Sequence, residues 1–220
     1  LATVGVYSAV VGLAGGLRKV NQTFNPIFAP VVAGMTATGD QQRAAATYAR
    51  LAEWMLWILL PSVAVMTLSG SVILLIYGPA FVQGGAWLGI VGIACATNAF
   101  VSLGETVIMV QRPHLNLLNS SVSCAIAFGA NLWLIPRFGV TGAAFGILLP
   151  YVIQGILRYG VLRLVFRWRN PWSSIRPPIL AAIIAIVPAL LWRFFLDGIA
   201  GEVMGGLVFL AIFGVGWLQH

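Results

Sequence analysis

Long apolar runs separated by short polar turns divide this chain into seven segments that we expect to cross a membrane. The segments are residues 2–35, 49–69, 86–110, 115–135, 141–162, 178–196 and 203–218. An α-helix needs about 20 apolar residues to cross a hydrocarbon core of about 30 Å. The runs are continuous and lack the period-two alternation of a membrane β-barrel. The pattern therefore predicts an all-α fold, a polytopic membrane helical bundle with about seven transmembrane helices.

The first segment differs from the others because charged and polar side chains gather near its centre. They are Arg18, Lys19, Asn21, Gln22 and Asn25. Three of them, Arg18, Gln22 and Asn25, are spaced to share one face of a helix. A charge deep in a bilayer costs about 3 kcal/mol or more, so it usually has a task or a partner. We expect this cationic, hydrogen-bonding stripe to face a cavity and to suit an anionic head group.

Two prolines, Pro26 and Pro30, follow the polar cluster and remove backbone hydrogen-bond donors. We expect them to bend or break the first helix. A second interpretation is open for the same residues. In it, Arg18 and Lys19 lie in a short loop at the membrane surface, and residues 20–32 form a separate segment.

Composition supports a membrane protein and argues against a nucleic-acid-binding one. Hydrophobic residues make up 60% of the chain and charged residues 8%, whereas soluble domains carry about 25% charged residues. The net charge is +7, but no basic run is long enough to bind a duplex, so we expect no nucleic-acid partner. Basic residues concentrated in the cytoplasmic turns of a membrane protein explain such a charge.

The distribution of arginines predicts the orientation of the bundle. The turns after the first, third and fifth segments, with the adjoining helix ends, carry Arg43, Arg50, Arg112, Arg163, Arg167, Arg169 and Arg176. The other side carries Arg137 and Arg193, with Asp197 and Glu202. We therefore expect a multi-pass protein of the cell inner (plasma) membrane with a cytoplasmic C-terminus. Because the chain begins with Leu1 and its first segment would enter from outside, we also expect it to be a fragment.

Residue types that serve in catalytic sites are present but scattered. The five acids lie in different turns and segments, and no phosphate-binding loop or nucleophile motif occurs. His114 lies in a turn, His220 ends the chain, and Cys95 and Cys124 lie within apolar segments. We expect the cysteines to be apolar packing residues, and we expect no metal site, no cofactor and no enzyme activity.

Glu105 is the one acid well inside an apolar segment. One interpretation gives it a role in transport, either as the partner of Arg18 or Lys19 or as the carrier of a proton or sodium ion. The other interpretation is a structural ion pair, or a side chain that reaches toward the membrane surface. The sequence does not favour one of these interpretations of Glu105 over the other.

Four short motifs occur in a defined order along the chain. They are residues 4–9 (VGVYSA), 39–40 (GD), 76–81 (IYGPAF) and 135–144 (IPRFGVTGAA). Together they resemble helix starts and turns between helices eight and twelve of the polysaccharide flippases in the multidrug/oligosaccharidyl-lipid/polysaccharide exporter superfamily. The last motif is the most specific, and its glycine and alanines allow one helix to start close against its neighbour.

The resemblance covers nearly the whole chain and implies helices eight to fourteen of a two-lobe transporter, whose N-terminal lobe is missing here. It implies a five-span bundle over residues 1–166, a basic cytoplasmic loop over 167–177 and two additional membrane helices over 178–220. It further implies export of a polyprenyl-diphosphate-linked saccharide from the inner to the outer leaflet by alternating access, in polysaccharide biosynthesis.

The resemblance also implies cationic residues in a central cavity that hold the diphosphate. By position, Arg18 and Lys19 are the candidates, because guanidinium and ammonium groups bind phosphate. Asn21, Gln22 and Asn25 are the candidates for contacts with sugar hydroxyls. Glu105 is the candidate for coupling to protons or sodium ions.

Other functions stay open. A cation-coupled multidrug exporter of the same superfamily would prefer acids in its cavity, and Glu105 is its only support. A membrane enzyme of glycan assembly, such as a polymerase or ligase, would need large external loops, whereas the predicted external turns are short. A purely structural membrane subunit is a further alternative.

Overall fold

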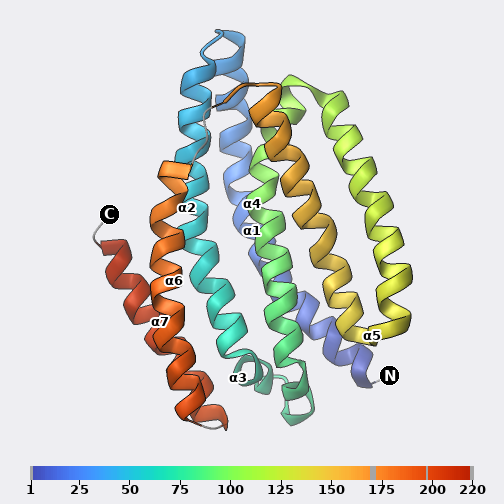
Figure 1. Cartoon of the computed structure of the whole chain (residues 1–220), viewed down its shortest axis with the longest axis vertical. Helices are drawn as coiled ribbons and strands as arrows, with labels where there is room; N and C mark the ends of the chain where they lie inside the picture. Colours follow the sequence, from blue (N-terminus) through green and yellow to red (C-terminus); the bar gives the residue numbers. More distant parts are fainter. Residues whose placement is uncertain (1, 169–171, 197, 219–220) are drawn as a thin grey trace.

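The computed structural model describes residues 2–168, 172–196 and 198–218, apart from the side chains of Ala2 and Asn21. Within these ranges it contains helices and no strand, which confirms the all-α prediction. The long helices, which lie side by side in Figure 1, are α1 (Ala2–Ala37), α2 (Gln41–Leu68), α4 (Gly85–Gln111), α5 (Pro113–Leu164), α6 (Trp172–Phe195) and α7 (Gly198–Leu218). Two short elements, α3 (Gly70–Leu75) and the 3-10 helix η1 (Pro79–Gly84), connect α2 to α4.

Five helical segments in the described part of the chain are long and apolar enough to cross a membrane. They are α2, η1 together with α4, α5, α6 and α7. α1 has the length but is not among the five, because Arg18, Lys19 and the neighbouring amides lower its hydropathy. The helices are those of a membrane-spanning protein, while the count of seven crossings stays a prediction.

α5 contains the predicted fourth and fifth segments as two arms that meet at Gly139. This residue has φ 55° and ψ −129°, a non-helical conformation that glycine adopts without the strain of a side chain. Figure 1 shows the first arm running down and the second returning beside the centre of the bundle. The arms approach closely, because a Cβ atom on Gly142 would overlap the carbonyl group of Leu134. The close helix start predicted for this motif is confirmed.

α1 is one continuous helix that passes through Pro26 and Pro30. The predicted break at the prolines is therefore wrong, and so is the surface-loop alternative, because Arg18 and Lys19 both lie inside this helix. Packing explains the continuity: α1 residues on both sides of the prolines are buried in the core, including Leu17 and Val32. Membrane helices tolerate proline when neighbouring groups compensate for the lost hydrogen bond.

The turns alternate between the two ends of the bundle as predicted. Figure 1 shows the α1–α2 turn, the α4–α5 turn and the end of α5 at the upper end, and the start of α1, α3, the bend of α5 and the start of α7 at the lower end. The described arginines of the three arginine-bearing turns therefore share the upper end. Arg169 and Asp197 lie outside the described residues, and the assignment of the upper end to the cytoplasm stays a prediction.

α6 and α7 pack against α2 on one side of the bundle. A separate apolar cluster joins the three helices and contains Trp57, Ala64, Leu68, Ala185, Ala189, Phe209 and Phe213. α6 begins at Trp172, whereas the predicted segment begins at residue 178, so Pro177 and Pro178 lie inside the helix. The division of the chain at residues 166 and 177 is not tested by this packing and stays a prediction.

Glu202 of α7 and Arg193 of α6 connect this pair of helices to the lower end of α2 and to α3. Its carboxylate accepts hydrogen bonds from the backbone N–H groups of Ser71 and Val72, at 3.0 and 3.2 Å, and its carbonyl oxygen accepts one from Ser69 Oγ at 2.8 Å. Arg193 of α6 lies 3.5 Å from the same carboxylate and also donates to the carbonyl oxygens of Thr67 and Leu68. Glu202 of α7 therefore contacts α3, α6 and the residue between α2 and α3.

Glu202→Gln is expected to lower the free energy of unfolding by about 1–2 kcal/mol, because a neutral amide accepts backbone hydrogen bonds less strongly than a carboxylate. The measurement is the unfolding midpoint of the purified chain in mixed micelles during a denaturant titration. Glu53→Gln is the control, since neither ion pair of the described residues includes Glu53. Equal midpoints for the two variants would show that the Glu202 contacts do not hold α7 in place.

Candidate functional site

The predicted cationic stripe lies on α1, and only part of it faces the bundle. Arg18 is half-buried and lies against Cys95, a buried residue of α4. Lys19 and Gln22 are exposed, whereas the side chain of Asn21 lies outside the described residues. The stripe is therefore split between a face that contacts α4 and a face that no described protein atom covers.

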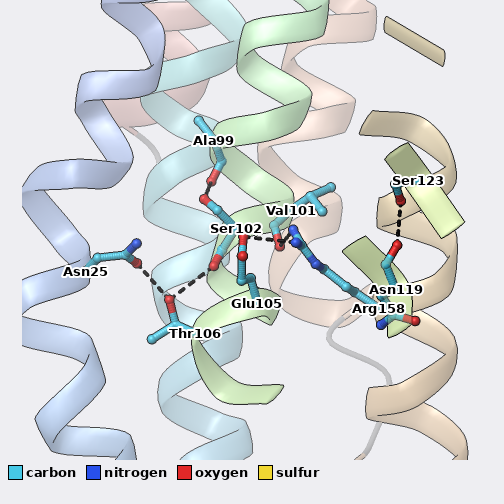
Figure 2. Close-up of polar contacts among 9 residues, drawn as sticks. All are labelled: Asn25, Ala99, Val101, Ser102, Glu105, Thr106, Asn119, Ser123 and Arg158. Carbon is cyan, nitrogen blue, oxygen red and sulfur yellow. Dashed lines mark hydrogen bonds and ion pairs between the residues drawn. The ribbon is translucent and has the colours of Figure 1, made fainter. Parts of the chain in front are cut away.

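Asn25 connects α1 to α4. Its Oδ1 atom accepts a hydrogen bond from Thr106 Oγ1 at 3.0 Å, and the same hydroxyl lies 3.1 Å from the carbonyl oxygen of Ser102 (Figure 2). Thr106 is 4% exposed. A hydrogen bond at such a covered position fixes the rotation of α1 about its axis relative to α4. The amide predicted to contact sugar is therefore engaged, through its oxygen, inside the protein.

Glu105 forms an ion pair with Arg158 of the second α5 arm. Arg158 Nη2 lies 2.9 Å from Glu105 Oε2, and Arg158 Nη1 lies 3.5 Å from the carbonyl oxygen of Val101. The side chain of Arg158 is 2% exposed and that of Glu105 is 36% exposed. The pair joins α4 to α5 (Figure 2), and it is the structural ion pair that one interpretation of the sequence anticipated.

The predicted pairing of Glu105 with Arg18 or Lys19 is wrong. The geometry explains this, because Glu105 points from α4 toward α5, whereas Arg18 and Lys19 belong to α1 on the other side of α4 (Figures 1 and 2). Arg158 was missed as a site residue because it lies near an arginine-rich helix end. One signal was available: Arg158 is the only charged residue between Thr141 and Leu162, and isolated charges within apolar spans usually have a partner.

These contacts form part of a polar layer that crosses the bundle. In Figure 2 it extends from Asn25 on α1, over Thr106 and Glu105 on α4, to Arg158 and Asn119 on the two arms of α5. Asn119 and Ser123 of the first arm are buried, and Ser123 Oγ donates to the carbonyl oxygen of Asn119 at 2.8 Å. Polar contacts between helices, here Asn25–Thr106 and Glu105–Arg158, help helices to associate in an apolar medium.

The charged groups in and beside the polar layer are those of Glu105, Arg158, Arg18 and Lys19. In the described part of the chain, no group of three or more His, Cys, Asp or Glu residues is arranged to hold a metal ion. The polar layer contains one carboxylate, that of Glu105, and Arg158 neutralises it. The exposed Lys19 and the half-buried Arg18 remain as groups that an anion would stabilise.

Comparisons with protein-family models, curated proteins and solved structures gave no match.

Proposed function

We propose that this chain is the second lobe, helices eight to fourteen, of a two-lobe membrane exporter. Its substrate is a saccharide linked to polyprenyl diphosphate, which moves from the inner to the outer leaflet of the plasma membrane by alternating access. In this proposal α1 and both arms of α5 cross the membrane, the arginine-rich end faces the cytoplasm, and an N-terminal lobe completes the transport path.

The main support for this proposal is that Arg18 and Lys19 have no acidic partner in the described residues. Both lie in the middle of a 36-residue helix. Neither forms an ion pair with an acid in the described residues, whose two ion pairs involve Arg158 and Arg193. A cation at this depth needs a compensating anion. A diphosphate supplies two such charges together with oxygen acceptors for both side chains.

The ion pair of Glu105 weighs against a drug exporter. A cavity for cationic drugs needs a carboxylate that is free to bind them, whereas Glu105 lies 2.9 Å from Arg158. Proton or sodium coupling through Glu105 remains part of the proposal, because its ion pair with Arg158 links α4 to the second arm of α5.

The short connections between the helices argue against an enzyme of glycan assembly. At the lower end, which the proposal places outside the cell, α2 and α4 are joined by α3 and η1, and the arms of α5 meet at a single bend. These connections leave no external domain in the described residues that would carry an active site.

Arg18→Gln/Lys19→Gln is expected to abolish export. The test expresses the complete gene that contains this chain in cells lacking their own flippase, and it measures surface polysaccharide together with the amount of protein in the membrane. Wild-type protein should restore the polymer. The double variant should be present in the membrane at a similar level and restore less than about a tenth of it, since two charge-assisted contacts are lost.

Arg43→Gln/Arg112→Gln is the matched control, because it removes two charges from exposed positions at the upper end. It should export normally. If the Arg18/Lys19 variant restores the polymer as well as wild type, the site assignment is wrong. If wild-type protein restores no polymer with any saccharide tested but increases drug resistance, the drug-exporter alternative replaces the proposal.

A further inference from the structure

A cavity lies at the upper end of the bundle, away from the polar layer. Its volume is about 590 Å³, and it is enclosed by the first turns of α2, the segment that follows α5 and the first turn of α6. Its lining combines polar groups with an apolar wall of alanines and aromatic rings. The polar residues are Gln41, Gln42, Arg167, Ser173 and Ser174. No residue of the proposed transport site contributes to it.

One wall of this cavity is held by a series of hydrogen bonds. Trp168 Nε1 donates to Gln41 Oε1 at 3.1 Å, and Gln41 Nε2 donates to Gln111 Oε1 at 3.4 Å. The carbonyl oxygen of Trp168 accepts from Arg163 Nη1 at 3.2 Å. Trp168 is 5% exposed and its ring lies 5.7 Å from that of Tyr48. The wall is therefore organised before any ligand arrives, which lowers the cost of binding.

Arg167 is the positively charged residue in the lining of this cavity. Its neighbours Phe166 and Trp168 pack into the core, while Arg167 itself is exposed and has φ 54°, a left-handed conformation. Non-glycine residues adopt this conformation rarely and at some energetic cost. The chain turns sharply at this residue, so that Phe166 and Trp168 pack inside while Arg167 is exposed and lines the cavity.

The charge around the cavity is mainly positive. Arg43, Arg163 and Arg176 lie on the helices that enclose it, and all three are exposed. The acid of the adjoining α1–α2 turn, Asp40, accepts a hydrogen bond from the backbone N–H of Arg43 as the N-cap of α2. Basic pockets between helices at the membrane surface bind anionic lipid head groups.

We propose that this cavity binds the phosphate group of an anionic phospholipid. Arg167 contacts the phosphate, the serine and glutamine side chains contact the glycerol and head-group oxygens, and the alanine wall contacts the first methylene groups of the acyl chains. The apolar wall favours a lipid over free phosphate. Because this site lies at the membrane surface and uses none of the residues assigned to export, the proposal does not depend on the proposed function.

The test measures lipid binding to the purified full chain in a neutral detergent by native mass spectrometry, with phosphatidylglycerol and phosphatidylcholine titrated separately. Wild-type protein should bind phosphatidylglycerol more tightly. Arg167→Gln should weaken that affinity by about tenfold, as expected for one charge-assisted hydrogen bond, and leave phosphatidylcholine binding unchanged. Ala46→Trp, at an exposed position of the lining, fills the cavity without changing charge and should weaken phosphatidylglycerol binding as well.

Arg176→Gln is the matched control, because it removes one exposed arginine of α6 that does not line the cavity. Equal effects of Arg167→Gln and Arg176→Gln would show that the whole basic end attracts the lipid and would overturn the proposal. Unchanged binding in Ala46→Trp would also overturn it. A final arm adds inorganic phosphate: displacement of phosphatidylglycerol by an equal concentration of phosphate would identify a free-phosphate site and reject the lipid.

Discussion

Glu105→Gln is expected to lower the free energy of unfolding by about 3 kcal/mol, the size of effect seen when one partner of a covered ion pair is removed. The variant leaves the guanidinium group of Arg158 in the protein with 2% exposure and no counter-charge. Its remaining hydrogen bond, to the carbonyl oxygen of Val101, is long at 3.5 Å. Its Nε atom is buried and has no hydrogen-bond partner in the described residues.

Removing the other partner, Arg158, is expected to lower the free energy of unfolding by less. Arg158→Met keeps an apolar side chain in the covered position and leaves behind Glu105, which is 36% exposed. A carboxylate with that exposure is only partly covered by protein, so leaving it without its partner costs less than leaving the covered guanidinium group. We expect a loss of about 1 kcal/mol for Arg158→Met, and a double variant, Glu105→Gln/Arg158→Met, that is more stable than Glu105→Gln alone.

Unfolding midpoints of the four proteins in mixed micelles, with helix content followed by circular dichroism, provide the measurement. Additive losses in the double variant would show that the two side chains do not interact energetically. Equal losses in the two single variants would contradict the difference in burial between Arg158 and Glu105.

Gly142→Ala is expected to destabilise the bundle by about 2–3 kcal/mol, at the upper part of the range for overpacking. The added Cβ atom would overlap the carbonyl group of Leu134 in the first arm of α5. This obstacle is backbone, so no rotamer change relieves it, and the two arms must separate.

Two further alanine substitutions make the prediction specific to this contact. Gly146→Ala should cost less, because its Cβ atom would meet the side chain of Asn131, which is able to move at the loss of its hydrogen bond to the Gly146 carbonyl oxygen. Gly129→Ala in the first arm has no atom within 4 Å of the new Cβ and should be neutral or stabilising by up to about 1 kcal/mol. If unfolding midpoints do not follow the order Gly142, Gly146, Gly129, the arms are not in the contact that the structure shows.

Much of the fold was predictable from the sequence. The apolar runs at residues 115–135 and 141–162 match the two arms of α5, and the glycine-rich motif between them is the bend. The alternation of the turns between two ends was also predicted. These features follow from local rules, because a backbone in lipid must satisfy its own hydrogen bonds within each helix.

The candidate site was predicted less well. The spacing placed Arg18, Gln22 and Asn25 on one face of α1, but it did not show that Asn25 would meet Thr106, a residue 81 positions away in the chain. The continuity of α1 through its prolines was missed, since packing against α4 outweighs the local loss of a hydrogen bond. The cavity beside Arg167 had no sequence signal, because three separate segments enclose it.

The sequence by itself determined that this chain is a helical membrane protein with arginine-bearing turns on one side, because length, hydropathy and charge act within each segment. Only the tertiary structure decided that Glu105 pairs with Arg158 and not with Arg18 or Lys19, and that Glu202 of α7 accepts hydrogen bonds from the backbone of α3. Such pairings depend on the rotation and neighbours of whole helices. These are set by side-chain packing between segments that lie far apart in the chain.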